Sequence, residues 1–360
     1  MIEVKNLVKQ YGNHAAVDDL SFTVETGKVV GFLGPNGAGK STTMNMITGY
    51  IAPTSGIVLI DGVDMEEEPE QVRKNIGYLP ENPPLYPDMR VREYLYFVAE
   101  LKKVPRKDRD VMVNEIMNRT KIVDVSERLI RHLSKGYKQR VGVAGAMMGY
   151  PEILILDEPT SYLDVKYKLE FLSMLQEMTR KKKIGVLMSL HELDLAERVS
   201  DKIVCVKGEN IEHYGTPEEV FTDGFVDQLY EITDGTFQEK NGCVELKKCG
   251  GIPEVFVIAG NGTGSFLFRQ LQRNGIPFAV GILGKNDIDY PAAEALAVQV
   301  IVAEAYQDFK REHYETAKQV MRTCRKVICC QTVFGSQNRL NRQLLQEAED
   351  CGMEIELWQK

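Results

Sequence analysis

One stretch near the N-terminus, residues 34–41, constrains the fold most, because it joins a glycine-rich loop to a lysine. Its sequence, Gly-Pro-Asn-Gly-Ala-Gly-Lys-Ser, fits the phosphate-loop pattern G-x-x-x-x-G-K-[ST]. Residues 28–33 predict a short buried strand before the loop, and residues 41–50 predict a helix after it. Such a turn leaves backbone N–H groups at a helix N-terminus, where a phosphate can sit. The stretch therefore predicts nucleotide binding in an α/β fold.

The chemistry of phosphoryl transfer also needs a metal site and a group that activates water. Lys40 is expected to reach the β- and γ-phosphates, and the Ser41 hydroxyl to ligate Mg²⁺. Further along, the apolar run 153–156 ends in Asp157 and Glu158. We expect Asp157 to face Mg²⁺ and Glu158 to act as general base on water. An acidic pair that merely ends a strand is the alternative, and the phosphate loop in the same domain disfavours it.

Composition narrows the class of partner and the compartment. A net charge of −8 argues against a protein that binds nucleic acid through bulk positive charge. The chain begins without a charged-then-apolar leader and has no run of 18 apolar residues. Its seven cysteines include no C-x-x-C pair, which favours reduced thiols. We expect a cytoplasmic protein that does not span a membrane by itself.

Element patterns divide the 360 residues into two α/β parts. Residues 1–223 are expected to form the nucleotide-binding domain, with a mainly helical part at about 88–150. Residues 224–250 read as a linker, with the boundary near Asn241. Strands and helices then alternate through residues 251–360, with strands at 254–259, 278–283, 298–303, 326–333 and 354–358. That alternation predicts a smaller Rossmann-like domain with a parallel sheet.

Six stretches in one order resemble the nucleotide-binding subunit of an ABC transporter, over residues 1 to about 223. They are Tyr11, the loop 34–42, Leu133-Ser134-Lys135-Gly136-Tyr137, Asp157-Glu158, Ser161-Tyr162-Leu163-Asp164 and His191. The resemblance implies a P-loop ATPase of the ABC type with a helical subdomain, an active ATP-hydrolysing enzyme that uses ATP and Mg²⁺. It assigns catalysis to Glu158, His191 and Lys40, and metal binding to Ser41, Glu81 and Asp157. It assigns nucleotide binding to Tyr11, Gly34, Pro35, Asn36, Gly37, Ala38, Gly39, Lys40, Ser41, Thr42, Ser134, Gly136 and Asp164.

The same resemblance implies assembly. Ser134 and Gly136 lie in the signature loop, which meets the ATP bound on a second subunit, and Asp164 lies in a loop that crosses the interface. The implied partners are a second copy or a related ATPase subunit, together with integral-membrane permease subunits on other chains. The implied location is peripheral, on the inner face of the cell membrane. No nucleic acid is expected as a partner.

Four residues depart from the commonest family pattern. Glu81 stands where the family usually has Gln, in the loop that touches the metal site and the membrane partner. Lys135 and Tyr137 replace Gly and Gln in the signature loop, and Tyr162 replaces Gly in the interface loop. None of these removes an essential hydrolytic group, so we expect an active ATPase.

The second domain carries a weaker pattern, Gly260-x-Gly262-x-Gly264 after a strand. It misses the spacing G-x-G-x-x-G, and no acidic residue directly closes the next strand. A dinucleotide cofactor and an anion or small-ligand site therefore both remain open, and a structural or regulatory module is favoured over either. The candidate ligand residues are Asn261, Thr263, Asn286, Asp287 and Asp289.

Resemblance leaves the direction of transport open. The Leu-Pro-Glu loop and the signature loop look like those of exporters, whereas residues 251–360 loosely resemble an extension on metal-chelate and corrinoid importers. Export is favoured, because the first domain has the sharper motifs. An importer subunit and a soluble ATPase gated by a ligand at the C-terminal domain are the alternatives. An ABC ATPase of translation or DNA repair is disfavoured, since those usually carry two such domains or a long coiled-coil insertion.

Overall fold

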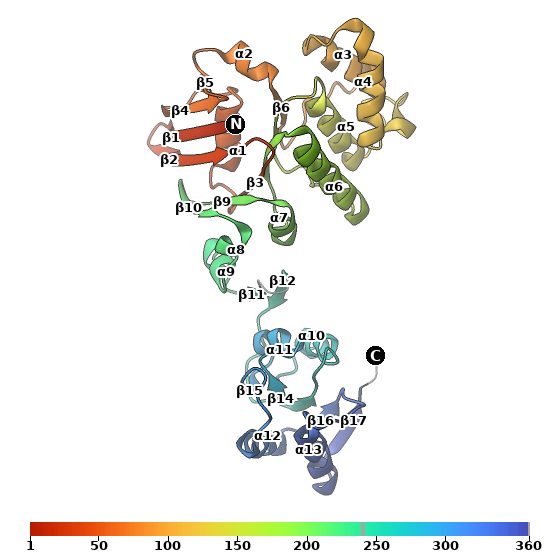
Figure 1. Ribbon diagram of the computed structural model, residues 1–360. Coiled ribbons are helices and arrows are strands. Elements are labelled where there is room, and N and C mark those ends of the chain that lie inside the picture. The colour runs from red at the N-terminus through yellow and green to blue at the C-terminus, as the bar shows by residue number, and fades with distance from the viewer. Residues whose placement is uncertain (239–241, 359–360) are drawn as a thin grey trace. The chain divides into compact units, whose positions relative to one another are not determined.

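The computed structural model describes residues 1–238 and 242–358 and divides into two compact units, Met1–Phe225 and Val226–Lys360 (Figure 1). Asn241, where the sequence predicts a boundary, lies outside the described residues. Each unit has its own sheets and its own core, so each is described by itself. In the described part of the chain, no helix is long and apolar enough to cross a membrane.

Two sheets form the first unit. The smaller sheet is antiparallel, with the order β2-β1-β4-β5. Its strands are β1 (Ile2–Tyr11), β2 (His14–Val24), β4 (Ser55–Ile60) and β5 (Val63–Asp64). The larger sheet has the order β10-β9-β3-β8-β7-β6 and is parallel except for β10. Its strands are β3 (Val29–Leu33), β6 (Ile76–Leu79), β7 (Ile153–Leu156), β8 (Gly185–Ser189), β9 (Lys202–Lys207) and β10 (Asn210–Gly215).

The sequence of the central strands explains the parallel arrangement. Strands β3, β7 and β8 are apolar almost throughout, and every residue in them is buried. Strands covered on both faces need such uninterrupted apolar runs. As a result, the carboxyl ends of β3, β8, β7 and β6 meet at one edge of the sheet.

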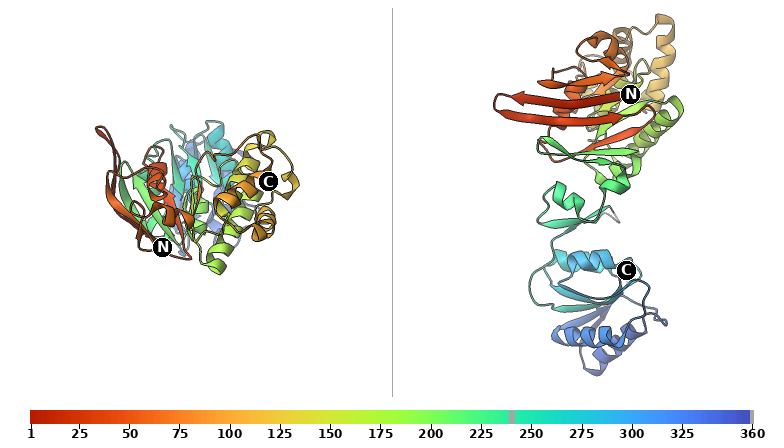
Figure 2. Two further views of the ribbon diagram at one scale, coloured as in Figure 1. Left: turned by 90° about the horizontal axis from the view of Figure 1, so that it is seen from above. Right: turned by 60° about the vertical axis from the view of Figure 1, so that its left-hand side comes forward.

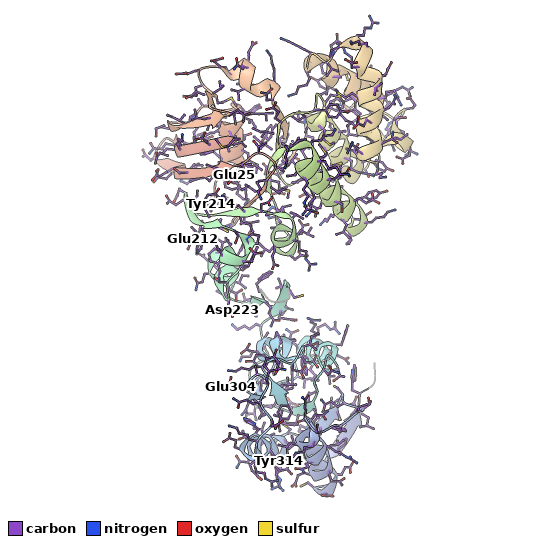
Figure 3. The ribbon with its side chains drawn as sticks, in the orientation of Figure 1. Glu25, Glu212, Tyr214, Asp223, Glu304 and Tyr314 are labelled. Carbon is purple, nitrogen blue, oxygen red and sulfur yellow. The ribbon has the colours of Figure 1, made fainter. Side chains whose placement is uncertain are left out.

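One apolar core lies between the two sheets and includes side chains of α1. Phe22 of β2 packs on Phe32 of β3, with ring centroids 5.6 Å apart. Near the rim of this core, Lys202 Nζ donates to Glu25 at 3.0 Å and lies 5.4 Å from the centroid of the Tyr214 ring; Glu25 and Tyr214 are both marked in Figure 3. The pair of Lys202 with Glu25 thereby links β9 of the larger sheet to the end of β2 in the smaller sheet.

The helices of the first unit gather mainly beside the larger sheet (Figure 1). They are α1 (Lys40–Ile47), α2 (Pro69–Lys74), α3 (Val91–Leu101), α4 (Arg106–Arg119), α5 (Lys135–Met147), α6 (Val165–Lys182), α7 (Leu193–Val199) and α8 (Pro217–Val220), with 3₁₀ turns η1 (Val123–Val125) and η2 (Ile130–His132). The expected helical part, 88–150, contains α3, α4 and α5. Helix α6 was not predicted, although Asp164 caps its N-terminus and three basic residues occupy its last turn.

The second unit is a three-layer α/β domain. Its five-stranded sheet is wholly parallel, with the order β15-β14-β13-β16-β17, as the alternating pattern predicts. Helices α10 and α11 cover one face and α12 and α13 the other (Figure 2). The elements are α9 (Phe225–Leu229), β11 (Gly235–Gln238), β12 (Cys243–Leu246), β13 (Val255–Ile258), α10 (Ser265–Arg273), β14 (Phe278–Gly284), α11 (Tyr290–Leu296), β15 (Gln299–Ala303), α12 (Arg311–Thr323), β16 (Lys326–Cys329), α13 (Arg339–Asp350) and β17 (Glu354–Leu357).

Two details differ from the sequence prediction. Strand β16 ends at Cys329 and not at 333, because its neighbour β13 ends at Ile258 and offers no further pairing. The expected linker, 224–250, contains α9 and the hairpin of β11 and β12. Glu245 of that hairpin is buried and ion-paired with Arg269 of α10, a contact that the polar sequence alone does not reveal.

A buried amide repairs a break in the second sheet. Ile282 lies within the register shift of β14 against β15, between Val280 and Leu283, and one residue beyond the last pair of β14 with β13, Gly281 with Ile258. Asn341 of α13 fills that place. Its Oδ1 accepts from Ile282 N at 2.9 Å, and its Nδ2 donates to Ile282 O at 3.1 Å. The side chain is 1% exposed, so water does not offer an alternative partner.

Replacing Asn341 by Leu is expected to lower the free energy of unfolding of the second unit by about 2–3 kcal/mol, because two buried backbone groups lose their partners. Urea unfolding followed by Trp358 fluorescence measures this, since the only tryptophan of the chain packs against the core of that unit. Gln343→Leu, an exposed position on the same helix, is the control. Equal unfolding midpoints for the two variants would contradict the role given to Asn341.

Candidate functional site

The carboxyl edge of the larger sheet brings the predicted chemistry together. The loop after β3 carries Gly34 to Gly39, and the loop after β7 carries Asp157 and Glu158. His191 follows β8, and Glu81 follows β6. Because β3, β8, β7 and β6 are successive parallel neighbours, four segments far apart in sequence end side by side.

The glycine loop has a backbone that tolerates little else at two positions. Gly34 has φ 151°, and an added Cβ would lie 2.2 Å from Val206 O. Gly39 has φ 78°, and an added Cβ would lie 2.3 Å from Ala16 O. Both distances are too short for any side chain, so these glycines let the loop pack closely on β9 and β2. Asn36 and Gly37 are exposed between them, where a ligand can approach the backbone.

Lys40 begins α1 and is 8% exposed. Its Nζ donates to Gly34 O at 2.7 Å and to Pro35 O at 2.9 Å, so the ammonium folds over its own loop. Burial lowers the pKa of Lys40, and the nearby carboxylates of Glu158 and Asp157 oppose that effect. A cation held by neutral carbonyls can exchange them for phosphate oxygens, which bind a charge more strongly.

The remaining predicted loop residues support this arrangement. Ala38 is buried, 5% exposed, and its N–H donates to Pro35 O at 3.3 Å. Ser41 is exposed at the start of α1, and Thr42 is half-buried. The next residue, Thr43, donates its hydroxyl to Gly39 O at 2.9 Å and so closes the first turn of the helix.

A single serine on β8 bonds both predicted acidic residues, Asp157 through its carboxylate and Glu158 through its backbone. Ser189 Oγ donates to Asp157 Oδ1 at 2.7 Å and accepts from Glu158 N at 2.8 Å. Asp157 is 2% exposed, so its side chain has little freedom to turn. Sequence reasoning missed Ser189, because it belongs to no motif; its only signal is its place at the end of a buried strand before His191.

Glu158 lies at the exposed side of the same edge, and its carboxylate is oriented by hydrogen bonds. Its backbone adopts φ 49°, a left-handed conformation that costs a non-glycine residue about 1 kcal/mol or more. The carboxylate accepts from Ser161 Oγ at 3.1 Å and is hydrogen-bonded to His191 Nε2. Two polar partners on a carboxylate that is still 21% exposed leave it oriented and open to water. The structure thus brings Glu158 and His191 together, as predicted.

One cavity of about 930 Å³ collects the predicted metal ligands. Ser41, Glu81 and Asp157 all line it. A hydroxyl and two carboxylates supply the hard oxygen atoms that Mg²⁺ prefers. The residues present therefore fit the metal. No group of three His, Cys, Asp or Glu side chains converges anywhere in residues 1–238 and 242–358, so the fit rests on two carboxylates and a hydroxyl.

Of the predicted nucleotide contacts, Ser41 lines that cavity, the rest of the glycine loop and Lys40 do not, and Tyr11, Ser134, Gly136 and Asp164 belong to other loops. Tyr11 ends β1 and is 53% exposed, with Lys9 Nζ 5.3 Å from the centroid of its ring. Ser134 and Asp164 are also exposed, and neither they nor Gly136 line the cavity. Ser134 Oγ accepts from Tyr137 N at 3.3 Å and so caps the N-terminus of α5. Asp164 Oδ1 caps α6 in the same way, accepting from Tyr167 N at 3.0 Å.

Helix α5 is tied to the catalytic edge by a second residue that sequence reasoning missed. Gln139 is 2% exposed, and its Nε2 donates to Glu158 O at 3.1 Å. Gly136, one turn earlier, packs so closely that an added Cβ would lie 2.8 Å from Tyr162 O. The signature loop and the loop that follows β7 therefore touch within one chain.

Tyr137, one of the departures, has a structural partner. Its ring lies 3.8 Å from Arg140 Cζ, and the ring of Tyr167 lies 4.0 Å from the same atom. Arg140 also donates to Lys121 O at 2.8 Å. A guanidinium between two aromatic faces joins α5 to α6.

The glycine loop of the second unit does not fit a phosphate. Asp289 is fully buried and accepts from Gly264 N at 2.9 Å and Ser265 N at 3.0 Å, while Asp287 accepts from Asn261 N at 3.0 Å. Three backbone N–H groups of this loop thus already donate to two carboxylates, and these carboxylates would repel an anion. Sequence reasoning saw no acidic residue directly after β14. It missed that the chain folds back to bring these two in.

Comparison with known proteins adds to this geometry. Residues 17–161 match the family described as ABC transporter, and residues 278–358 match one described as the MJ0874 family. An uncharacterized ABC transporter ATP-binding protein of Methanocaldococcus jannaschii is 30% identical, with 79% of this chain and all of that protein covered. A sulfate/thiosulfate import ATP-binding protein of Thermosynechococcus vestitus is 31% identical, over 67% of this chain and 74% of that one.

Two solved structures extend the likeness to three dimensions. An ATP-binding subunit of an ABC transporter is 30% identical with a TM-score of 0.59, over 64% of this chain and 98% of that one. A dimeric bacterial ABC transporter cassette is 26% identical with a TM-score of 0.57, over 60% of this chain and 99% of that one.

Proposed function

Since the chain belongs to the family of ABC transporter ATP-binding proteins, we propose that it powers transport by ATP-driven pairing of two ATPase subunits. It is the ATP-binding subunit of an ABC transporter and an ATPase. The observation that carries the proposal is the division of the predicted site. Lys40, Ser41 and Glu158 lie at the carboxyl edge of one sheet, whereas Ser134 and Gly136 lie at the N-terminus of α5, where Ser134 is exposed.

Each residue at the edge has a part in hydrolysis under this proposal. The N–H groups of the loop and the Lys40 ammonium bind the phosphates. Glu158, oriented by His191 and Ser161, takes the proton from the attacking water. Ser41, Asp157 and Glu81 would hold Mg²⁺, which neutralises charge that develops on the phosphate oxygens.

The exposed groups on α5 and before α6 complete the site from outside. Ser134 sits at the N-terminus of a 13-residue helix, whose backbone donors and dipole favour an anion. In one chain these groups line no common cavity with Ser41. We therefore place Ser134, Gly136 and Asp164 against the ATP of a second copy or of a related subunit, as the dimeric relative supports.

The membrane partners and the direction of transport are part of the proposal. Permease subunits on other chains would bring this ATPase to the inner face of the membrane. Export is favoured over import on the Leu-Pro-Glu loop that ends in Glu81 and on the signature loop with Lys135. Co-purification of the chain with a protein of about six hydrophobic spans tests the partner.

Pairing is tested with Glu158→Gln, which should trap ATP. In saturating Mg-ATP this variant is expected to sediment as a dimer and in ADP as a monomer, because only the γ-phosphate joins the two half-sites. Ser134→Tyr in the same background, which fills the space for that phosphate, should abolish the dimer. Sedimentation velocity distinguishes these species. A Glu158→Gln protein that binds ATP and stays monomeric would overturn the proposed pairing.

A further inference from the structure

A second hollow, of about 360 Å³, lies beside the catalytic edge and collects three of the four departures from the family pattern. Glu81, Lys135 and Tyr162 all line it, together with Lys138. They come from three separate places: the loop after β6, the start of α5 and the loop before α6. The hydrolytic roles proposed for the catalytic edge do not explain why these three residues depart from the family pattern together.

Glu81 places a carboxylate between two hollows of the protein. It lines both this hollow and the larger cavity that holds Ser41 and Asp157. Within residues 1–238 and 242–358, no ion pair or hydrogen bond of its carboxylate is seen. This carboxylate shares the larger cavity with Ser41 and Asp157. The usual Gln brings no such charge, so where no metal ion is bound only a protein cation can offset Glu81.

Lys135 is placed to supply that cation. Its Nζ lies 4.7 Å from the centroid of the Tyr162 ring, a cation–π contact, and it makes no ion pair in the described part of the chain. Tyr162 is itself held in a left-handed conformation, with φ 64°, where the family pattern has Gly. Strain at an exposed residue usually marks a functional constraint. Here it keeps an aromatic ring beneath the lysine.

We propose that Lys135 is a positioning residue that neutralises Glu81 when ATP binds. Without nucleotide, the ammonium rests on Tyr162. A contact of this kind at an exposed site is weak. When the phosphates arrive, the repulsion on Glu81 rises, and Lys135 pairs with the Glu81 carboxylate across the hollow. The loop after β6 can then approach the nucleotide. This inference rests on the proposed function, because it assumes that the phosphates of ATP bind beside Ser41, at the rim of the larger cavity.

A double-mutant cycle tests the pairing, with ATP affinity measured by calorimetry in EDTA, so that the readout needs neither metal nor turnover. Lys135→Gln is expected to weaken ATP binding by about tenfold, a typical coupling between neighbouring residues. In EDTA the role of Glu81 toward Mg²⁺ plays no part, and Glu81→Gln alone should tighten ATP binding by about threefold at most, because Lys135 already offsets the charge that is removed. The double variant Glu81→Gln/Lys135→Gln should return to within about twofold of the unaltered chain. Lys135→Arg, which keeps the charge, should also stay within about twofold.

Effects that simply multiply would overturn the inference, as would a loss in Lys135→Arg equal to that in Lys135→Gln. Glu66→Gln and Lys107→Gln form the matched control pair, since both positions are exposed and neither lines the hollow. Their effects should be near unity. If the unaltered chain failed to bind ATP, the proposed function would fail first. If it binds ATP while the cycle is multiplicative, only the role of Lys135 fails.

Discussion

Glu158→Gln is expected to slow ATP hydrolysis by about 10³-fold while ATP affinity stays within about threefold, because the amide cannot take the proton from water yet keeps the shape of the side chain. The backbone anchors of residue 158 should persist, since Ser189 Oγ and Gln139 Nε2 bond its N–H and its carbonyl. Phosphate release under saturating Mg-ATP measures the rate, and calorimetry measures the affinity.

Glu197→Gln is the control for that experiment. Glu197 is an exposed carboxylate on α7, the helix that follows His191. Its loss should change the hydrolysis rate by less than about twofold, since an isolated surface charge contributes little. Turnover of Glu158→Gln at the rate of the unaltered chain would remove Glu158 as the base. A parallel loss of ATP affinity would assign it to binding instead.

Lys40→Met is expected to weaken ATP binding by at least about 100-fold, or 2.7 kcal/mol, which is within the range for deleting one partner of a buried, hydrogen-bonded charge pair. Methionine keeps the length of the stem and removes the ammonium, so the loop should stay folded. Gly34 O and Pro35 O lose a donor, so a loss of stability can accompany the loss of affinity and has to be measured beside it. Calorimetric titration with ATP measures the effect, and the melting temperature shows whether the loop is intact.

Lys28→Met provides the matched control for Lys40. Lys28 Nζ pairs with Asp201 at 3.0 Å at an exposed site of the same unit. A pair of that kind contributes about 0–1 kcal/mol to stability and nothing to phosphate binding. ATP affinity should therefore remain that of the unaltered chain. Equal losses in Lys28→Met and Lys40→Met would show that charge in general, and not the loop lysine, governs binding.

Much of the first unit can be predicted from its sequence, because its key residues are local signals. The spacing of residues in the loop 34–41 predicts the start of a helix. The apolar run before Asp157 predicts the end of a strand. The family resemblance is likewise confirmed by the comparisons. Strands β3, β7 and β8 are recognisable by their apolar runs, whereas the order that brings their ends to one edge comes from the fold.

The residues that sequence reasoning missed act through tertiary contacts. Ser189 and Gln139 are polar residues in apolar surroundings with no motif, and their partners lie 32 and 19 positions away in the chain. The carboxylates of Asp287 and Asp289 reach back over about 25 residues to a glycine loop. Only the structure shows whether the backbone N–H groups of such a loop are free to bind a ligand or already donate to side chains. In the same way, only the structure shows that three departures from the family pattern, Glu81, Lys135 and Tyr162, line one hollow.

The bridging hydroxyl of Ser189 has a mechanical consequence. Because one oxygen donates to Asp157 and accepts from the N–H of Glu158, two neighbouring acids with different duties are joined to the end of β8 as a single body. His191 leaves the same strand two residues later. A displacement of that strand end therefore carries all three groups at once. Substitution of Ser189 would therefore release Asp157 and Glu158 from the end of β8 at the same time.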